Sequence, residues 1–214
     1  MAENPAETLE ATGGRAYHHG DLRRTLLTAA RELLVERGVT GFSLREVARR
    51  AGVSPRAPYH HFPDRIALLA AVAREGFDGL AALMAAEMEI ADPEERLKAL
   101  GLAYLRFAAE SPAEFQTMHC DELCSLETFP DRPEVAEGSF RYLFATLEDL
   151  AGRSLSEEEG RRIGLVAWAA VHGLATLRSE GVLRTDFPGE DLDDVLAEAV
   201  GRTARMLVSE LRRT

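Results

Sequence analysis

The stretch "SLREVARRAGVS", residues 43–54, decides how this chain folds. Ser43, followed three residues later by Glu46, is the capping-box signature of a helix start. Gly52 supplies the positive φ angle that ends a helix, and Ser54 is a natural N-cap for the next one. Two short helices joined by a three-residue connection have the spacing of a helix-turn-helix.

Helical periodicity extends over the rest of the chain, and no segment alternates as a strand does. We therefore expect an all-α fold of about nine helices: an N-terminal three-helix unit with the helix-turn-helix, and a C-terminal helical bundle. The expected helices span residues 21–37, 44–51, 55–61, 65–90, 93–110, 112–124, 134–151, 157–180 and 192–212. The segments 127–133 and 184–190 are expected to be loops.

The expected helix at 55–61 begins with Pro55, at a first position where a missing N–H is harmless. Pro58 removes a second N–H near the helix start, so this helix should be tight or 3₁₀-like. The second helix of a helix-turn-helix enters the major groove through its N-terminal residues. Arg56 can donate two hydrogen bonds to guanine, and Ala57 or a proline ring can contact a thymine methyl group.

The charge distribution supports a nucleic-acid partner at this end of the chain. Residues 15–65 carry a net charge of +5, whereas the remainder carries −16, for a total of −11. The alternative to DNA contact by Tyr59, His60 and His61 is a structural role, in which Tyr59 is a half-buried aromatic ring and the two imidazoles are merely exposed to solvent. The candidate DNA-binding residues are Ser43, Arg45, Ser54, Pro55, Arg56, Ala57, Tyr59, His60, His61 and Arg65.

The acidic part of the chain suits dimerisation. The expected helix at 157–180 is almost entirely apolar between Ile163 and Leu177, which is typical of a helix buried on both sides. Together with the helix at 192–212 it could form a two-fold four-helix interface, the alternative being that both helices are plain core. The candidate interface residues are Gly164, Ala169, Gly173, Val195, Ala199 and Met206.

A ligand pocket is expected among the helices between residues 65 and 180, since bundle interiors bind small molecules. Trp168 and His172 are four residues apart, on one helix face, and a histidine in so apolar a helix needs a partner. The candidates are Tyr104, Phe107, Phe115, Met118, His119, Phe144, Trp168 and His172. The alternative for each of them alone is a plain core position.

Cys120 and Cys124, in "HCDELC", share a helix face near His119. We interpret them as structural cysteines, with thiol sensing and metal binding as alternatives, because this spacing is not a zinc pattern. The sequence holds no Gly-x-Ser-x-Gly, phosphate-binding loop or His-Glu-x-x-His motif. We therefore predict no catalytic residues, no metal and no cofactor.

Two features indicate a cytoplasmic protein with no membrane partner. No apolar run is long enough to span a bilayer, and the N-terminus lacks a secretory signal. Residues 1–18, rich in Glu, Thr and Gly, are expected to be a flexible arm.

Residues 19–80 resemble the DNA-binding domain of the tetracycline-repressor (TetR) family. The matching stretches are "LLTAARELLVERGVTGFSLREVARRAGVS" (26–54), "YHHF" (59–62) and "DRIALLAAV" (64–72). Arg65 stands where the family usually has a lysine that contacts a phosphate. "PRAP" (55–58) departs from the more usual Gly-Thr-aliphatic. "WAAVHG" (168–173) resembles the Trp-x-x-x-His-Gly signature of one subgroup of the family.

The resemblance implies an arm at 1–18, a DNA-binding domain at 19–80 and an effector-binding and dimerisation domain at 81–214. The expected protein is a homodimeric regulator that binds a palindromic double-stranded DNA operator. It would act as a repressor that releases the operator when an unknown small-molecule effector binds, with activation as the alternative sign. The rival function is a helical small-molecule-binding dimer without a DNA-binding role.

Overall fold

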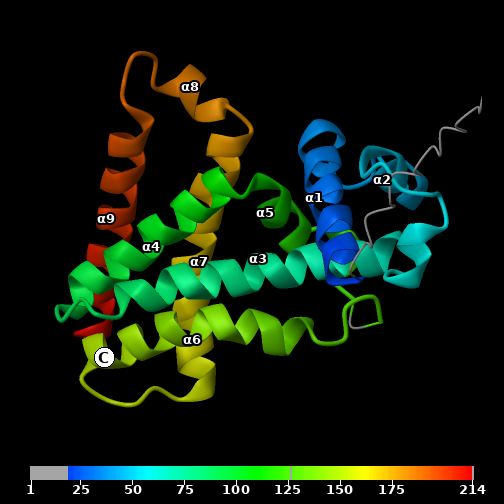
Figure 1. Ribbon diagram of the computed structural model, residues 1–214. Coiled ribbons are helices and arrows are strands. Elements are labelled where there is room, and N and C mark those ends of the chain that lie inside the picture. Colours follow the sequence, from blue (N-terminus) through cyan, green and yellow to red (C-terminus); the bar gives the residue numbers. More distant parts are fainter. Residues whose placement is uncertain (1–18, 126, 214) are drawn as a thin grey trace, which may run out of the picture.

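The computed structural model describes residues 19–125 and 127–213, and this part of the chain is helical (Figure 1). The all-α class is confirmed, while the proposed arm at 1–18 lies outside the described residues. The elements are α1 (His19–Arg37), α2 (Leu44–Arg50), the 3₁₀ helix η1 (Ala57–His60), α3 (Arg65–Glu87), α4 (Pro93–Glu110), α5 (Pro112–Met118), the 3₁₀ helix η2 (Asp121–Leu123), α6 (Arg132–Ala151), α7 (Glu157–Ser179), α8 (Val182–Asp186) and α9 (Leu192–Leu211).

Local sequence signals account for most of these boundaries. The capping box of α2 is complete: the Ser43 hydroxyl accepts the N–H of Glu46 at 3.4 Å, and the Glu46 carboxylate accepts the N–H of Ser43 at 3.0 Å. Gly52, with φ at 68°, lets the chain leave α2. Asp92 caps α4, and Pro93 stands at its first position.

The expected helix at 55–61 is shorter than predicted. Pro55 and Arg56 form a turn in which Ala57 N–H donates to the Ser54 carbonyl at 3.0 Å, and η1 follows. Because Pro58 has no N–H, an α-helical hydrogen bond cannot form at that position, and the 3₁₀ geometry predicted for it is confirmed. The predicted cap by Ser54 was wrong, since no side chain caps η1.

Two other expected boundaries were also wrong. The helix predicted at 112–124 ends at Met118, and the chain turns through η2 so that Leu123 becomes fully buried in the core. The loop predicted at 184–190 begins inside α8, which starts directly after Gly181. Gly181 has a φ of 78°, and this left-handed residue redirects the chain into a five-residue helix without a capping side chain.

The long helix α3 connects the two ends of the molecule. Figure 1 shows α1 and α2 gathered at one end of α3 and α9 near the other. Helices α4, α5 and α6 pack against α3, and α7 and α9 pack against α4. One buried core runs from Leu26 in α1 to Val200 in α9. The domain boundary expected between residues 80 and 81 falls inside α3, so this helix joins the two proposed units rigidly.

Within the described segments, no helix is both long enough and apolar enough to cross a lipid bilayer.

Candidate nucleic-acid interface and ligand cavity

The turn before η1 forms the centre of the candidate interface. Pro55 and Arg56 are exposed, and Tyr59 keeps 50% of its surface in contact with solvent. Ala57 is half-buried, while Pro58 is buried and anchors the segment to the core. The segment therefore presents a cation and a phenol from a fixed backbone, with Ser54 and His60 also exposed beside them.

Three exposed arginines lie at or near this turn, and no carboxylate among the described residues neutralises their charge. The side chains of Arg45, Arg49 and Arg56 make no ion pair or hydrogen bond with any residue that the structure describes. By contrast, Arg37 pairs with Glu46 at 2.6 Å, and Arg50 pairs with Glu32 and Glu36. Within α2 and the segment that leads into η1, Arg45, Arg49 and Arg56 thus keep positive charge that a polyanion can use.

Other candidates for DNA contact already have roles within the chain. The hydroxyl of Ser43 is part of the α2 capping box. His61 is half-buried, and its Nε2 atom is buried without a hydrogen-bond partner among the described residues. Arg65 donates to the Val39 carbonyl at 2.7 Å and forms an ion pair with Glu122. Arg65 is therefore not a free cation in this conformation, which sequence reasoning did not foresee.

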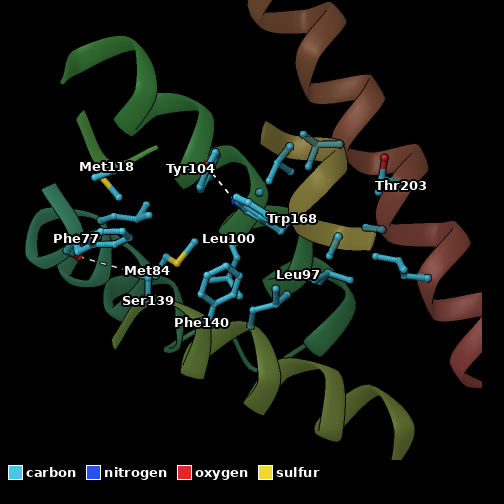
Figure 2. A pocket seen from close by; sticks show the side chains of 18 of the residues that line it. Phe77, Met84, Leu97, Leu100, Tyr104, Met118, Ser139, Phe140, Trp168 and Thr203 are labelled. Atoms are coloured by element: carbon cyan, nitrogen blue, oxygen red, sulfur yellow. Dashed lines mark hydrogen bonds between the residues drawn. The ribbon is translucent and has the colours of Figure 1, made fainter. Parts of the chain in front are cut away.

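An apolar cavity of about 60 Å³ lies between α3, α4, α6, α7 and α9 (Figure 2). Figure 2 shows side chains from these helices turned toward a common space, with Trp168 near its centre. Four of the residues predicted for the pocket line it: Tyr104, Met118, His119 and Trp168. Further lining comes from Phe77, Leu80, Met84, Leu97, Leu100, Gly101, Ser139, Phe140, Leu143, Ala167, Val171, Val200, Thr203, Ala204 and Leu207.

The other predicted pocket residues lie outside that lining. Phe107 is buried in the core, and its ring is close to Gly79 of α3. Phe144 packs against Gly164 of α7, so close that a Cβ at residue 164 would lie 2.8 Å from its ring. Phe115 and His172 stand behind the cavity wall, in ring contact with each other at 5.4 Å between centroids. Sequence patterns could not separate these aromatics from the lining ones, because all of them follow the same apolar periodicity.

Tyr104 is the hub of a polar cluster at the edge of the cavity. Its hydroxyl accepts the indole N–H of Trp168 at 3.2 Å and lies 2.9 Å from His172 Nδ1 and 3.3 Å from His119 Nε2. A phenol has one proton, so it can donate to only one imidazole, and the other ring must donate to the phenol oxygen. The hydrogen-bonding capacity of the phenol is therefore used within the cluster while both imidazoles stay neutral.

Burial strengthens this neutral state. It raises the pKa of Tyr104 well above its ordinary value, despite the opposing hydrogen bond from Trp168. Burial, helped by the nearby His172 and Arg132, lowers the pKa of His119 to about 4, and burial also lowers the pKa of His172. The cavity thus offers an uncharged hydrogen-bonding edge beside an apolar interior.

We expect the folded state to lose stability in mild acid because of His119. Its pKa is depressed from 6.5 to about 4, so its contribution is complete above pH 6.5 and is lost as the pH falls toward 4. In that window the unfolded chain binds a proton that the folded chain rejects, at a cost on the order of 2 kcal/mol by pH 4.5. Urea unfolding at pH 7 and pH 4.5 measures this difference.

The substitution His119→Gln should shrink that pH dependence by about the same amount. The matched control is His60→Gln, because the side chain of His60 is exposed. An unchanged pH dependence in His119→Gln would mean that another group is responsible.

The candidate dimer residues differ in exposure. Met206 of α9 is 72% exposed and Ala169 of α7 is exposed, whereas Gly173, Val195 and Ala199 are half-buried. Gly164 is buried against Phe144 of the same chain, so its small size serves packing within one subunit. Sequence reasoning missed Leu165 and Val166, which are 58% and 55% exposed on α7.

The two cysteines lie on either side of η2. Cys124 is exposed, and its thiol donates to the Cys120 carbonyl at 3.4 Å. Burial raises the pKa of the Cys120 thiol, which makes it less reactive at neutral pH. Over residues 19–125 and 127–213, no three His, Cys, Asp or Glu side chains group as metal ligands.

Family models match both parts of the chain. The model for "Tetracyclin repressor-like, C-terminal domain" matches residues 97–213, more than half of the sequence, and that for "Bacterial regulatory proteins, tetR family" matches residues 26–72. The chain belongs to the TetR family. This confirms the resemblance drawn from residues 19–80 and makes the protein a transcriptional regulator with a helix-turn-helix, not an enzyme.

Individual relatives and solved structures vary in their similarity to this chain. The transcriptional activator FasR of Mycolicibacterium smegmatis is 34% identical over 110 residues, so the match spans about half the length of that curated relative and 50% of this chain. A structure of a protein of unknown function from Rhodococcus sp. RHA1 is 34% identical, with a TM-score of 0.74, over 90% of this chain and 98% of that one.

The regulator FadR from Bacillus subtilis, solved in complex with stearoyl-CoA, has a TM-score of 0.67 over 87% of this chain and 97% of that one. At 17% identity, the likeness shows the fold alone.

Proposed function

We propose that this TetR-family protein is a homodimer that binds a palindromic operator through α2 and η1 and responds to an acyl compound held in the cavity. In this proposal, the domain at residues 19–80 contacts DNA, and the domain at residues 81–214 binds the effector and the partner subunit. Support for DNA contact comes from Arg45, Arg49 and Arg56, which are exposed and unpaired within the described segments.

The residues that line the cavity indicate the chemical class of the effector. Its walls are aliphatic and aromatic, apart from Tyr104, His119 and Trp168 at one edge and the small hydroxyls of Ser139 and Thr203. Among the described residues, no lysine, arginine or carboxylate lines it, so a charged group would be poorly solvated inside. An acyl chain suits the walls, and its carbonyl oxygen suits the neutral donors. The B. subtilis protein solved with stearoyl-CoA supports the same class.

The cavity is small for a long acyl chain. Ligand sites generally measure roughly 300–1,000 Å³, and this cavity has a volume of about 60 Å³. Met84 and Met118 belong to its wall, and unbranched thioether side chains rearrange readily. Binding would therefore widen the cavity on the side of α3 and α5, which carry Met84 and Met118. A ligand that prefers the widened state shifts the protein toward it.

The proposed dimer face combines α7 and α9. Support comes from the large exposed apolar side chains Leu165, Val166 and Met206, which two-fold association would remove from water. We also propose that Trp168, His172 and Gly173 mark the Trp-x-x-x-His-Gly subgroup. The shared contact of Trp168 and His172 with the Tyr104 hydroxyl gives that motif a role in shaping the cavity.

Tryptophan fluorescence tests the effector directly, because Trp168 is the only tryptophan in the sequence and lines the cavity. Titration with stearoyl-CoA should change its emission saturably. In a gel mobility-shift assay, the same concentrations should alter the fraction of the DNA flanking its gene that the protein binds. Free CoA is the control for the head group. A fluorescence change without any effect on DNA binding would favour the rival function, a ligand-binding dimer without a DNA role.

The sign of regulation needs its own measurement. We propose repression with release of the operator by the effector. The M. smegmatis relative is an activator, which favours activation as the second candidate. Transcription in vitro from a template carrying the operator decides between them: repression predicts transcript that rises with stearoyl-CoA, and activation predicts more transcript when the protein is added.

A further inference from the structure

Arg65 lies where three parts of the chain meet. It is the first residue of α3, its guanidinium donates to the Val39 carbonyl in the α1–α2 connection at 2.7 Å, and it forms an ion pair with Glu122 of η2. Val39 follows the end of α1 in the helix-turn-helix unit, whereas η2 belongs to the effector-binding part. This ion pair joins the base of the helix-turn-helix to η2, as the ion pair between Arg31 of α1 and Glu114 joins α1 to α5.

The Glu122 carboxylate is only partly satisfied in this position. One oxygen binds Arg65, but Oε1 is buried and has no hydrogen-bond partner among the described residues. A buried carboxylate oxygen without a donor is unfavourable compared with a hydrated one. The ion pair between Glu122 and Arg65 is therefore not a fully satisfied hydrogen-bond network, and the chain can break it at a lower cost than it could break such a network.

Glu122 is tied to the cavity wall by a short hydrogen-bonded segment. Met118 and His119 line the cavity, and η2 begins two residues later. Cys120 N–H donates to the Thr117 carbonyl at 3.4 Å, and Leu123 N–H donates to the Cys120 carbonyl at 3.1 Å. Leu123 is fully buried and fixes η2 against the core. A displacement of His119 by a ligand would therefore be passed on to Glu122.

We propose that Glu122 competes with a DNA phosphate for Arg65. In the conformation described here the carboxylate neutralises the guanidinium, so Arg65 is withheld from DNA. The position of Glu122, and with it the charge that Arg65 offers, depends on the cavity wall. The inference rests on the proposed function, because it assumes that α2 and η1 face an operator. Glu122 would then be the residue that couples the cavity to the DNA-binding surface.

The salt dependence of operator binding tests this without any ligand. The substitution Glu122→Gln keeps the shape of the side chain but removes its charge. Each phosphate contact adds roughly 0.9 to the slope of log affinity against log salt. We expect Glu122→Gln to steepen the slope by about that amount per subunit and to tighten binding roughly three- to ten-fold at 0.1 M salt. The control is Asp121→Asn, since Asp121 is exposed on the same 3₁₀ helix and makes no ion pair with a described residue.

A double-mutant cycle shows whether the effect passes through Arg65. In an Arg65→Ala background, Glu122→Gln should change neither the slope nor the affinity beyond the change seen with Asp121→Asn. The proposal is wrong if Glu122→Gln and Asp121→Asn behave alike, or if the effect of Glu122→Gln survives without Arg65. Far-UV circular dichroism and thermal unfolding establish that each variant is folded.

The same data separate this inference from the proposed function. If the wild-type protein retains no DNA specifically at low salt, the DNA-binding role fails and the competition fails with it. If the salt slopes behave as expected but stearoyl-CoA has no effect on operator binding, the competition stands and only the proposed effector is wrong.

Discussion

Replacement of Arg56 by alanine is expected to weaken specific operator binding by at least about 30-fold. A bidentate arginine–guanine pair contributes roughly 1–3 kcal/mol of base discrimination, and a two-fold dimer would lose one pair in each half-site. The side chain is exposed directly before η1 and makes no hydrogen bond or ion pair with a described residue that alanine would remove. Fluorescence anisotropy on the operator duplex and on a random duplex of equal length measures the loss.

Comparison of the two duplexes distinguishes base recognition from general charge. If Arg56 reads a base, Arg56→Ala should lose affinity mainly for the operator; an equal loss on both duplexes would make it a phosphate contact instead. The control is Arg141→Ala on α6, which removes one exposed arginine whose guanidinium lies over Tyr142. Arg141→Ala should bind both duplexes almost as the wild type does.

The second large effect concerns stability at the crossing of α3 and α5. A Cβ atom at Gly76 would lie 2.7 Å from Met118 Sδ and 2.9 Å from Glu114 Cβ, so only glycine fits between the two helices. We expect Gly76→Val to lower the free energy of unfolding by about 2–3 kcal/mol through overpacking. For a chain of this size, that corresponds to a fall in Tm of roughly 5–10 °C, measured by circular dichroism.

Gly138→Ala in α6 is the matched control for that variant. A Cβ at Gly138 would have no atom within 4 Å, so alanine should stabilise the helix by up to about 1 kcal/mol. The two variants are thus expected to shift Tm in opposite directions. A Gly76→Val protein that melts no lower than the wild type would show that α5 can move away from α3 at little cost.

Features with a local cause could be predicted from the sequence. Ser43 and Glu46 form the capping box that their spacing indicates, and Gly52 ends α2 with a positive φ. Pro58 forces the 3₁₀ geometry expected from its missing N–H. In each case the deciding interactions lie within a few residues of one another, so the sequence alone contains the physical information.

Features that depend on distant residues could not be predicted in this way. The ion pair between Arg65 and Glu122 joins positions 57 residues apart, and neither flanking sequence indicates the other. The cavity wall includes Leu80, Leu97 and other aliphatic residues whose pattern is the same as that of a filled core. Whether an apolar position faces a cavity or another side chain depends on how whole helices cross, which periodicity does not specify.

The two prolines around Arg56 have a thermodynamic consequence for recognition. A loop or a fraying helix end must give up backbone freedom when it binds, at roughly 1–2 kcal/mol per residue fixed. Pro55 and Pro58 each lock one φ angle, and Pro58 is buried, so much of that freedom is already absent in the free protein. DNA binding should therefore cost this segment little conformational entropy. The segment should also meet the DNA rapidly, as a rigid body. The same stiffness leaves the segment little ability to adapt to altered base pairs, so discrimination among operators should be strict.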